Sequence, residues 1–384
     1  GAERGADEEA AVALAEDALA DACIDPRAVA AVVSIDLKAD EAAVAAVAKA
    51  LSAPLRLFSG TELAAEEHRL KNPSEAVRRC IGIPGVAEAS ALAAAGPDGT
   101  LLVEKRARDR VTVAIAAAPE PIDPEIGRAR GHLVIVGIGP GTPLWRTAEA
   151  VAYLAKADAF VGYGLYLDLV EDLRGDRPRH DFPLGAEEER TRFALELAGE
   201  GKTVALISSG DAGIYAMASL AAELLDRGDL PAAATRVALT VAPGISAAQA
   251  AAARAGAPLG HDFAFISLSD LLTPWAVIEK RLVAAAEADF AVALYNPRSQ
   301  RRTTQLAAAL DIFKGARSGE TPAIIASSLG RPAETVRHES LASLDPESVD
   351  MLSTVLIGSS TTRRFVRGDG RPVVYTPRGY EVAP

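Results

Sequence analysis

The stretch VIVGIGPGTP, Val134–Pro143, indicates the fold of the larger part of this chain. Its apolar first half predicts a buried strand, and its three glycines together with Pro140 predict a tight turn. A helical pattern follows from Trp145 onward. A glycine turn of this kind lets a bulky ligand approach the backbone at the carboxyl end of a strand. We therefore expect a ligand-binding α/β fold.

The turn does not fit the dinucleotide-binding sequence G-x-G-x-x-G. Gly137 and Gly139 match it, but Thr142 stands at the sixth position, and Pro140 has no amide to offer a pyrophosphate. No acidic residue follows at the expected strand end. The turn is therefore expected to hold something other than a dinucleotide, and a nicotinamide-dependent oxidoreductase is the least favoured class.

The composition favours a helix-rich α/β protein packed with small side chains. The chain has 384 residues, enough for two or three domains, and is 49% apolar but only 5% aromatic. Its net charge of −12 argues against nucleic acid as the main partner, whereas an anionic small molecule stays open if basic residues gather locally. No apolar run approaches the ~20 residues needed to span a membrane, so we expect no membrane partner.

Cysteine and histidine usage predicts a cytoplasmic protein without a metal centre. Cys23 and Cys80 are the only cysteines, and they fit no metal-binding spacing and allow at most one disulfide. The five histidines are scattered, with no pair four residues apart. The acidic amino-terminal stretch carries no secretion signal.

A proline-rich segment divides the chain. Residues 119–130 read PEPIDPEIGRAR, and the clustered prolines and charges predict a linker. We expect a small α/β accessory domain over residues 1–118 and a two-lobed module after the linker, with lobes at 131–245 and 246–384. A cleft between two lobes is a favoured place for a ligand.

Hydrophobic periodicity predicts alternating helices and strands in both parts. In the first part we expect helices at Glu8–Cys23, Asp40–Leu51 and Ala64–Leu70, strands at Val32–Ile35 and Leu55–Phe58, and a hairpin of Leu101–Val103 and Val111–Ile115. In the second part we expect strands at Leu133–Val136, Ala159–Val161, Val204–Ile207, Val237–Val241, Phe263–Ile266, Phe290–Leu294, Ala323–Ala326 and Thr354–Ile357. Helices between most of these strands predict a parallel sheet in the first lobe.

Four loops of small and polar residues leave the carboxyl ends of the predicted strands, where ligands sit in an open α/β sheet. They contain Gly139–Gly141, Ser208–Tyr215, Val241–Ala247 and Tyr295–Ser299. Asp211 in the second loop is suited to cap backbone amides, or to hold a hydroxyl or amino group of a ligand. Each loop alone is compatible with an ordinary turn, but the four together favour a binding site.

The loops belong to longer motifs that resemble a known family. Residues 131–380 contain, in order, GIGPG, SSGDAGIYAMA, APGISAAQAAAARAGAPLGHDF, ISLSDLLTPW, ALYNPRS and GSSTTR. They resemble the precorrin-3B C(17)-methyltransferases, a cobalamin-pathway branch of the class III tetrapyrrole methyltransferases. LSDLLTPW and the terminal YTPRGY are more specific to this branch than the glycine motifs. The resemblance implies S-adenosylmethionine-dependent methylation of precorrin-3B at ring carbon 17 with ring contraction, giving precorrin-4 and S-adenosylhomocysteine.

The first domain resembles the C-terminal domain of the cobalamin-pathway lactone hydrolase, cobalt-precorrin-5A hydrolase. The resemblance lies in SIDLKADE (Ser34–Glu41), LRLFSGTEL and KNPSEAVRRCIGIPGVAEASAL. In that family an initial strand leads into a Gly-Cys-x-x-Gly turn, whereas Ala2 stands here in place of the cysteine. We therefore expect no lactone hydrolysis; the opening strand and hydrolase domains would belong to a longer parent chain. The domain is expected either to bind an intermediate or partner enzyme or to be purely structural.

The resemblance implies a folded S-adenosylmethionine between the two lobes, held mostly through backbone groups. Glycines give a bulky ligand access to the chain, and neutral polar residues avoid trapping the cationic sulfonium. Carried onto this sequence, the cofactor contacts fall on Pro140, Ser209, Gly210, Asp211, Ile214, Ser246, Ala247, Asn296 and Gly330.

Methyl transfer depends on the positioning of donor and acceptor more than on covalent help. Ring contraction favours an acid or base that steers tautomers. The candidates are His261, Asp262, Ser267, Ser269 and Asp270. A loop histidine, a turn residue and a helix cap are the alternatives for His261, Asp262 and Ser269 respectively.

The acetate and propionate groups of such a macrocycle require a basic rim, and the planar fork of arginine binds both oxygens of a carboxylate. The candidate substrate contacts are Tyr163, Arg298, Arg302, Arg331 and Arg363, with Tyr166, Arg301, Arg364 and Arg378 as further members of the set. Solvated arginines and packed tyrosines are the alternative. We expect charge removal at Arg298 or Arg363 to weaken tetrapyrrole binding more than cofactor binding.

Two other functions stay open. One is the cobalt-containing counterpart of the anaerobic route, a cobalt-factor III methyltransferase. The other is a non-catalytic tetrapyrrole carrier, which would bind the macrocycle without consuming the cofactor. We expect a homodimer, the usual state of this class, and other cobalamin-pathway enzymes as further partners.

Overall fold

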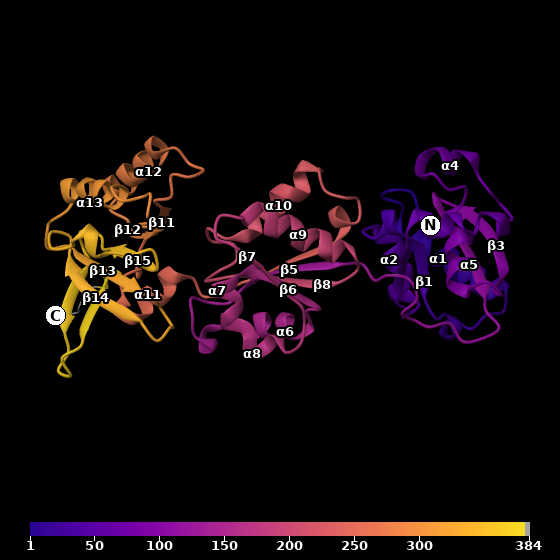
Figure 1. Ribbon diagram of the computed structural model, residues 1–384, viewed down its shortest axis with the longest axis horizontal. Helices are drawn as coiled ribbons and strands as arrows, with labels where there is room; N and C mark the ends of the chain where they lie inside the picture. Colours follow the sequence, from indigo (N-terminus) through magenta and orange to yellow (C-terminus); the bar gives the residue numbers. More distant parts are fainter. Residues whose placement is uncertain (381–384) are drawn as a thin grey trace.

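Three bodies follow one another along the chain in the computed structural model, which describes residues 1–380 (Figure 1). Each body combines helices with its own sheet or sheets, which confirms the predicted α/β class. No helix within residues 1–380 combines the length and the apolar character needed to cross a membrane.

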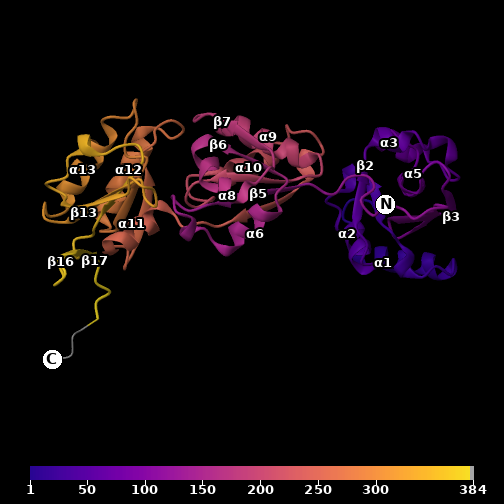
Figure 2. The same ribbon diagram turned by 60° about the horizontal axis from the view of Figure 1, so that its bottom comes forward.

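The first body contains two two-stranded sheets. β1 (Val32–Ile35) pairs in parallel with β2 (Leu55–Phe58), and β3 (Thr100–Arg108) pairs antiparallel with β4 (Val111–Ala117). These strands confirm the predicted pair and hairpin. The helices are α1 (Glu8–Asp21), α2 (Ala42–Ala50), α3 (Gly60–Ala64), α4 (Glu75–Ile81) and α5 (Val86–Ala95). Figure 2 shows α1 and α5 on opposite sides of the strands.

The prediction of a helix at Ala64–Leu70 is wrong. α3 ends at Ala64, and a single 3-10 turn covers Glu67–Arg69. The Ser59 hydroxyl accepts the Glu62 amide at 3.2 Å, and the Glu62 carboxylate accepts the Ser59 amide at 2.6 Å. This reciprocal cap fixes the helix start at Gly60. The periodicity also does not predict α5, because its alanines surround the helix and leave no amphipathic face.

An apolar cavity of about 530 Å³ lies between β1 and β4 in the first body. Within residues 1–380, each of these strands pairs with one neighbour strand only. The wall consists almost wholly of alanine, valine, leucine and isoleucine side chains. Because binding sites combine apolar walls with a few convergent polar groups, this cavity is a poor candidate for the chemistry of the chain.

The proline-rich segment is anchored to β2 rather than free. Arg128 and Leu57 exchange two backbone hydrogen bonds of 2.8 and 2.9 Å. The buried guanidinium of Arg56 donates to the three successive carbonyl oxygens of residues 125–127. Arg128 therefore forms an isolated bridge to the edge of β2, and the Arg56 side chain holds residues 125–127, contacts that composition alone does not reveal.

The middle body contains a parallel sheet, as the sequence predicts, and its five strands lie in the order β7-β6-β8-β5-β9. Its strands are β5 (His132–Gly137), β6 (Ala159–Tyr163), β7 (Arg179–Phe182), β8 (Thr203–Ser208) and β9 (Ala238–Ala242). Helices α6 (Ala148–Lys156), α7 (Gly164–Leu167) and α8 (Glu171–Arg174) cover one face, and α9 (Glu187–Gly199) and α10 (Met217–Arg227) cover the other (Figure 1). The edge strand β7, RHDF, escapes prediction because it lacks apolar alternation.

The third body is built on a mixed sheet in the order β11-β12-β15-β13-β14. β11 and β12 are parallel, and the other pairs are antiparallel. Its strands are β11 (Phe263–Ser267), β12 (Ala291–Tyr295), β13 (Pro322–Ser327), β14 (Thr335–Ser340) and β15 (Ser353–Ile357), and a small second sheet contains β10 (Gly256–Ala257), β16 (Arg363–Val366) and β17 (Pro372–Tyr375).

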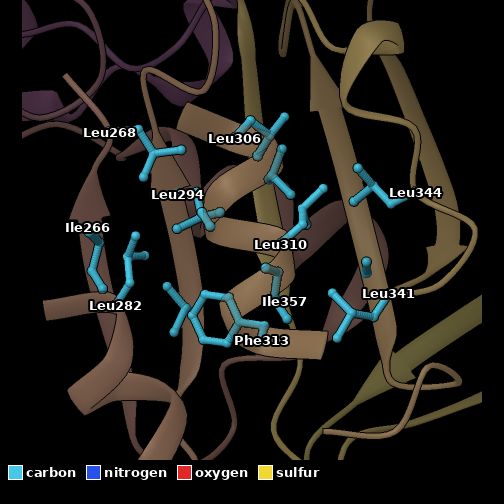
Figure 3. Close-up of a cluster of buried hydrophobic side chains, with 14 of the residues drawn as sticks. Ile266, Leu268, Leu282, Leu294, Leu306, Leu310, Phe313, Leu341, Leu344 and Ile357 are labelled. Carbon is cyan, nitrogen blue, oxygen red and sulfur yellow. The ribbon is translucent and has the colours of Figure 1, made fainter. Parts of the chain in front are cut away.

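Helices cover both faces of this mixed sheet. α12 (Trp275–Glu287) and α13 (Gln305–Ala316) pack on one face, where Leu282 and Phe313 meet Leu294 and Ile357 of the strands (Figure 3). α11 (Ala247–Ala255) packs on the opposite face through its buried alanines. The amino end of α11 thereby points to the junction with the middle body.

Candidate functional site

A pocket of about 190 Å³ lies at the junction of the middle and third bodies. The middle body supplies the loops that follow β5 and β8, and the third body supplies the start of α11 and the loops around β12, β13 and β15. Eight of the nine predicted cofactor residues line it: Pro140, Ser209, Gly210, Asp211, Ile214, Ser246, Ala247 and Asn296. The ninth, Gly330, lies between two residues that do, Leu329 and Arg331.

Close backbone contacts explain the glycines of the middle body. Gly139 and Gly210 exchange backbone hydrogen bonds of 3.1 and 2.9 Å, which join the loops after β5 and β8. A Cβ added to Gly244 would stand 2.1 Å from the Gly210 carbonyl oxygen, and one added to Gly137 would stand 2.7 Å from the Gly244 nitrogen. No side chain fits at these places, so three loops converge on one wall of the pocket.

Asp211 fixes two of these loops with its carboxylate. Oδ1 accepts the Gly213 amide at 2.8 Å, within its own loop. Oδ2 accepts the Gly244 amide at 3.1 Å, in the loop after β9. Asp211 therefore caps backbone amides, one of the two roles expected for it. Because it also lines the pocket, it lies next to any bound molecule.

The first turn of α11 borders the pocket with its amides already capped. The Ser246 hydroxyl accepts the Gln249 amide at 3.2 Å, and the Tyr295 hydroxyl accepts the Ala248 amide at 3.1 Å. Burial raises the pKa of Tyr295, so this hydroxyl stays protonated at neutral pH. These two side chains therefore shape the wall, and backbone groups are left to meet a ligand.

Three lining residues adopt a backbone conformation that side chains rarely occupy. Tyr215, Asn296 and Ser328 have φ values of 51°, 50° and 52°. Such left-handed residues are costly and concentrate at functional sites, where the surrounding structure holds them. Their clustering supports the pocket as the functional site. Sequence reasoning placed Tyr215 and Tyr295 in predicted ligand loops without giving them a role, and it missed Ser328, which no local pattern marks.

The structure does not bring His261 and Asp262 to the pocket. They precede β11, whereas the pocket lies beyond the carboxyl end of the parallel strand β12. Five strand residues separate the two ends, about 16 Å at roughly 3.3 Å per residue. Their side chains are 57% and 77% exposed. His261 is therefore a loop histidine and Asp262 a turn residue, as in the alternatives given for them.

The other acid–base candidates lie at the correct end of β11. The Ser267 hydroxyl accepts the Asn296 side-chain amide at 3.0 Å and the Ser269 backbone amide at 3.2 Å. Asp270 accepts Gln305 Nε2 at 2.8 Å. The alternative of Ser269 as a helix cap is wrong, because α12 begins only at Trp275, after Pro274.

One candidate arginine lines the pocket, and a second is hydrogen-bonded to a lining residue. Arg331 lines it and donates through Nε to the Pro140 carbonyl oxygen at 3.3 Å, across the two bodies. Arg302 donates through Nε to the Asn296 carbonyl oxygen at 2.8 Å and through Nη1 to Ser269 at 3.4 Å. Burial lowers the pKa of Arg302, an effect that nearby Asp270 opposes.

The remaining substrate candidates have other surroundings. Arg298 forms an ion pair with Glu347 and donates to the Pro346 carbonyl oxygen. Arg363 lies on β16, in the small second sheet, and its side chain is exposed. Tyr163 packs edge-on against Tyr166, with ring centroids 5.2 Å apart, and only Tyr166 lines the pocket. These placements favour Arg302 and Arg331 as the basic groups of the site.

A short polar chain holds the two bodies together behind the pocket. The guanidinium of Arg254 on α11 stacks over Trp145 of the middle body at 4.5 Å. Arg254 also pairs with Glu334 at 2.6 Å, and Glu334 accepts the Gly330 amide at 2.6 Å. Within residues 1–380 no three histidine, cysteine, aspartate or glutamate side chains come together as metal ligands.

Glycine-rich loops at strand ends form a pocket between two α/β lobes, and this arrangement points to the class of protein. Residues 132–345 match the family described as Tetrapyrrole (Corrin/Porphyrin) Methylases, and the chain belongs to this family, so it is a methyltransferase. Residues 1–116 match the family described as Cobalamin synthesis G C-terminus. Both matches agree with the resemblances carried by the sequence motifs.

Among particular proteins, the methylase part is similar to the probable cobalt-factor III C(17)-methyltransferase of Salmonella typhimurium, with 47% identity over 248 residues, 65% of this chain and 99% of that protein. It is also similar to the precorrin-3B C(17)-methyltransferase of Sinorhizobium, with 44% identity over 251 residues, 65% of this chain and 97% of that protein. The solved structure of the methyltransferase CobJ matches with 39% identity and a TM-score of 0.59, covering 64% of this chain and 100% of that chain.

Proposed function

We propose that this chain binds S-adenosylmethionine in the pocket between its two lobes and methylates ring carbon 17 of precorrin-3B, with ring contraction to precorrin-4, in cobalamin biosynthesis. The observation that carries the proposal is the lining of the pocket. Eight residues assigned to the cofactor from separate sequence motifs converge there from both lobes. The names of the relatives supply the substrate and the carbon.

The residues present fit this cofactor. The pocket-lining Gly210 has a φ of 71°, and a Cβ added there would find its nearest atoms 3.8 Å away, so its missing side chain leaves open space beside the lining. The wall there is made of backbone and neutral groups, apart from Asp211 and Arg331. When bound, the cofactor supplies an electrophilic methyl group on a cationic sulfonium. A mostly neutral wall holds such a cation without trapping it in an ion pair.

The chain's own residues act by positioning. Asp211 and the glycine contacts fix three loops of the middle body, and Asn296 is held by Ser267 and Arg302. These contacts set the orientation of donor and acceptor, which supplies most of the rate in a methyl transfer. The hydroxyl groups of Ser267 and Ser269 are hydrogen-bonded to Asn296 and Arg302, and Asp270 follows Ser269 in the chain, so we place the tautomer-steering step of ring contraction there.

The direct test is a reaction of the purified chain with precorrin-3B and S-adenosylmethionine. Mass spectrometry should show one added methyl group, and NMR of the product should place it at carbon 17. A matched reaction with Gly210→Trp should give no product, because the indole would occupy the pocket. An unmodified tetrapyrrole with the wild-type chain would contradict the proposal.

The cobalt-containing substrate is the second candidate, because one of the relatives is named a cobalt-factor III methyltransferase. Parallel reactions with precorrin-3B and cobalt-factor III distinguish the two by their specificity constants. Tetrapyrrole binding with no cofactor consumption in either reaction would favour the carrier function instead. The homodimer, the cytoplasmic location and the contribution of the first domain stay predictions.

A further inference from the structure

Four aromatic rings form a continuous row that leads out of the pocket. Ring centroids lie 5.2 Å apart between Tyr215 and Tyr295, 5.6 Å between Tyr295 and Phe265, and 5.4 Å between Phe265 and Phe263. Tyr215 and Tyr295 line the pocket. The two ends of the row, Tyr215 and Phe263, are 53% and 47% exposed. In a chain that is only 5% aromatic, this is an unusual concentration at one place.

The row joins the two lobes. Phe263 and Phe265 stand two residues apart on β11, so they share one face of the sheet, and Tyr295 follows on β12. Tyr215 comes from the other lobe, after β8. Its hydroxyl donates to the Phe265 carbonyl oxygen at 2.8 Å, on the free edge of β11. The backbone of Tyr215 is left-handed, with φ 51°, and its side chain reaches across to the opposite lobe.

A cation, Arg302, is hydrogen-bonded to the residue that follows Tyr295 in the chain. Arg302 donates through Nε to the carbonyl oxygen of this residue, Asn296. No carboxylate oxygen within residues 1–380 lies within 4.0 Å of its guanidinium nitrogens. A partly buried arginine in this state is suited to an anionic group brought by a ligand. The rings are tilted to one another by 33° to 56°, so a flat ligand would stack on one of the two exposed rings, Tyr215 or Phe263, rather than along the whole row.

We propose that the acceptor macrocycle binds at this aromatic row, where it stacks on Tyr215 and Arg302 binds one of its carboxylates. The inference rests on the proposed function and specifies where its substrate lies. A conjugated ring system with carboxylate arms matches both parts of the surface, because aromatic faces stack and the arginine fork binds carboxylate. Tyr215 borders the cofactor pocket as well, so it positions the acceptor next to the donor.

The test compares Tyr215→Ala, Tyr215→Phe and the control Phe365→Ala, since Phe365 on β16 is 49% exposed and lies outside the row. Absorbance titration with precorrin-3B and calorimetric titration with S-adenosylhomocysteine give the two dissociation constants. We expect Tyr215→Ala to raise the tetrapyrrole constant about ten-fold and the cofactor constant about two-fold or less. Tyr215→Phe, which keeps the ring, and Phe365→Ala should remain near wild type.

An unchanged tetrapyrrole constant in Tyr215→Ala would overturn the inference. An equal loss of both affinities would also overturn it, because the ring would then belong to the cofactor. If Tyr215→Ala fails to fold, Phe263→Ala gives the same test outside the pocket lining, with an expected rise of about three-fold. A wild-type chain that binds S-adenosylhomocysteine but neither precorrin-3B nor cobalt-factor III would contradict the proposed substrate itself. If the wild type binds the tetrapyrrole and the variants bind it equally well, only the proposed binding at the aromatic row is contradicted.

Discussion

Gly141 in one lobe lies directly against Gly330 in the other. A Cβ added to Gly141 would stand 2.5 Å from the Leu329 carbonyl oxygen and 2.7 Å from the Gly330 carbonyl carbon. A Cβ added to Gly330, whose φ is 70°, would stand 2.5 Å from the Thr142 nitrogen. The backbones of the two lobes therefore touch without side chains between them, next to Pro140 and Arg331 of the pocket wall.

Gly141→Ala should force the lobes apart at this contact. Overpacking of this size costs about 1–3 kcal/mol, so we expect binding of S-adenosylhomocysteine to weaken about ten-fold. Gly315→Ala is the matched control, because a Cβ at that helical position meets no atom within 4 Å. Calorimetric titration measures both. Equal affinities for Gly141→Ala and Gly315→Ala would show that the contact does not set the pocket.

Asp211→Ala removes the acceptor of two backbone amides in different loops. Since each loop carries cofactor-lining residues, we expect about ten-fold weaker binding of S-adenosylhomocysteine. Asp211→Asn keeps one acceptor oxygen and should retain more affinity than alanine. If asparagine and alanine lose affinity equally, the negative charge rather than the hydrogen bonding is what the site requires.

Charge removal at Arg302 should weaken tetrapyrrole binding more than the same change at Arg298. Among the described residues 1–380, no carboxylate pairs with Arg302, which is hydrogen-bonded to Asn296, whereas Arg298 is already paired with Glu347. We expect Arg302→Gln to raise the dissociation constant of precorrin-3B about ten-fold and Arg298→Gln about two-fold or less. Titrations with S-adenosylhomocysteine serve as the control for each variant. If Arg298→Gln raised the dissociation constant of precorrin-3B more than Arg302→Gln, Arg298 rather than Arg302 would be the substrate contact.

Arg56→Ala should release the segment between the first and middle bodies. The buried guanidinium donates to three carbonyl oxygens of that segment, which would lose their partners together. We expect a loss of about 2 kcal/mol of stability and faster proteolysis within residues 119–130. Arg27→Ala, at a 90% exposed side chain that pairs with the nearby Asp25, is the control. Unchanged proteolysis in Arg56→Ala would contradict the anchoring role.

Low pH should weaken the hydrogen bond that the Gly330 amide donates to the Glu334 carboxylate. Burial opposes the charge of Glu334, but hydrogen bonds from Arg254 and from the Gly330 amide outweigh it and hold the pKa below its usual range. A lowered folded-state pKa means that the stabilisation is present above the unfolded pKa of about 4.3 and is lost as pH falls through the folded value.

Thermal melting of wild type and Glu334→Gln between pH 7 and pH about 3.5 measures this effect. The wild type should be the more stable protein near neutral pH, and the difference should shrink below pH about 4. A difference that stays constant across this range would assign the stabilisation to the side chain's shape rather than to its charge.

The sequence predicted four of the five strands of the middle body, because each of these four is a short apolar run bounded mostly by glycine or charge. Leu133–Val136 lies inside β5, and Val204–Ile207 lies inside β8. In a parallel sheet covered by helices on both faces, side chains on both sides of a strand are buried, so consecutive residues of the strand are all apolar. Polar edge strands such as β7 and β14 carry no such signal, since one edge and part of each face stay in water.

The pocket was predictable where the chain carries a local motif, as at Gly210 and Asn296. The loop of Tyr215 was predicted, but its bond to the opposite lobe was not, and Ser328 was missed because only its backbone conformation marks it. His261 illustrates the converse. Its chemistry fits an acid or base, but only the direction of β11 shows that it stands at the far end of the strand.

A crystal structure of the chain with S-adenosylhomocysteine tests the central claim most directly. The account predicts that the ligand lies between the lobes, in contact with Gly210 and Asp211 on one side and Ala247 and Asn296 on the other. Density for the ligand in the apolar cavity of the first body, or at any place outside the junction of the lobes, would contradict the account.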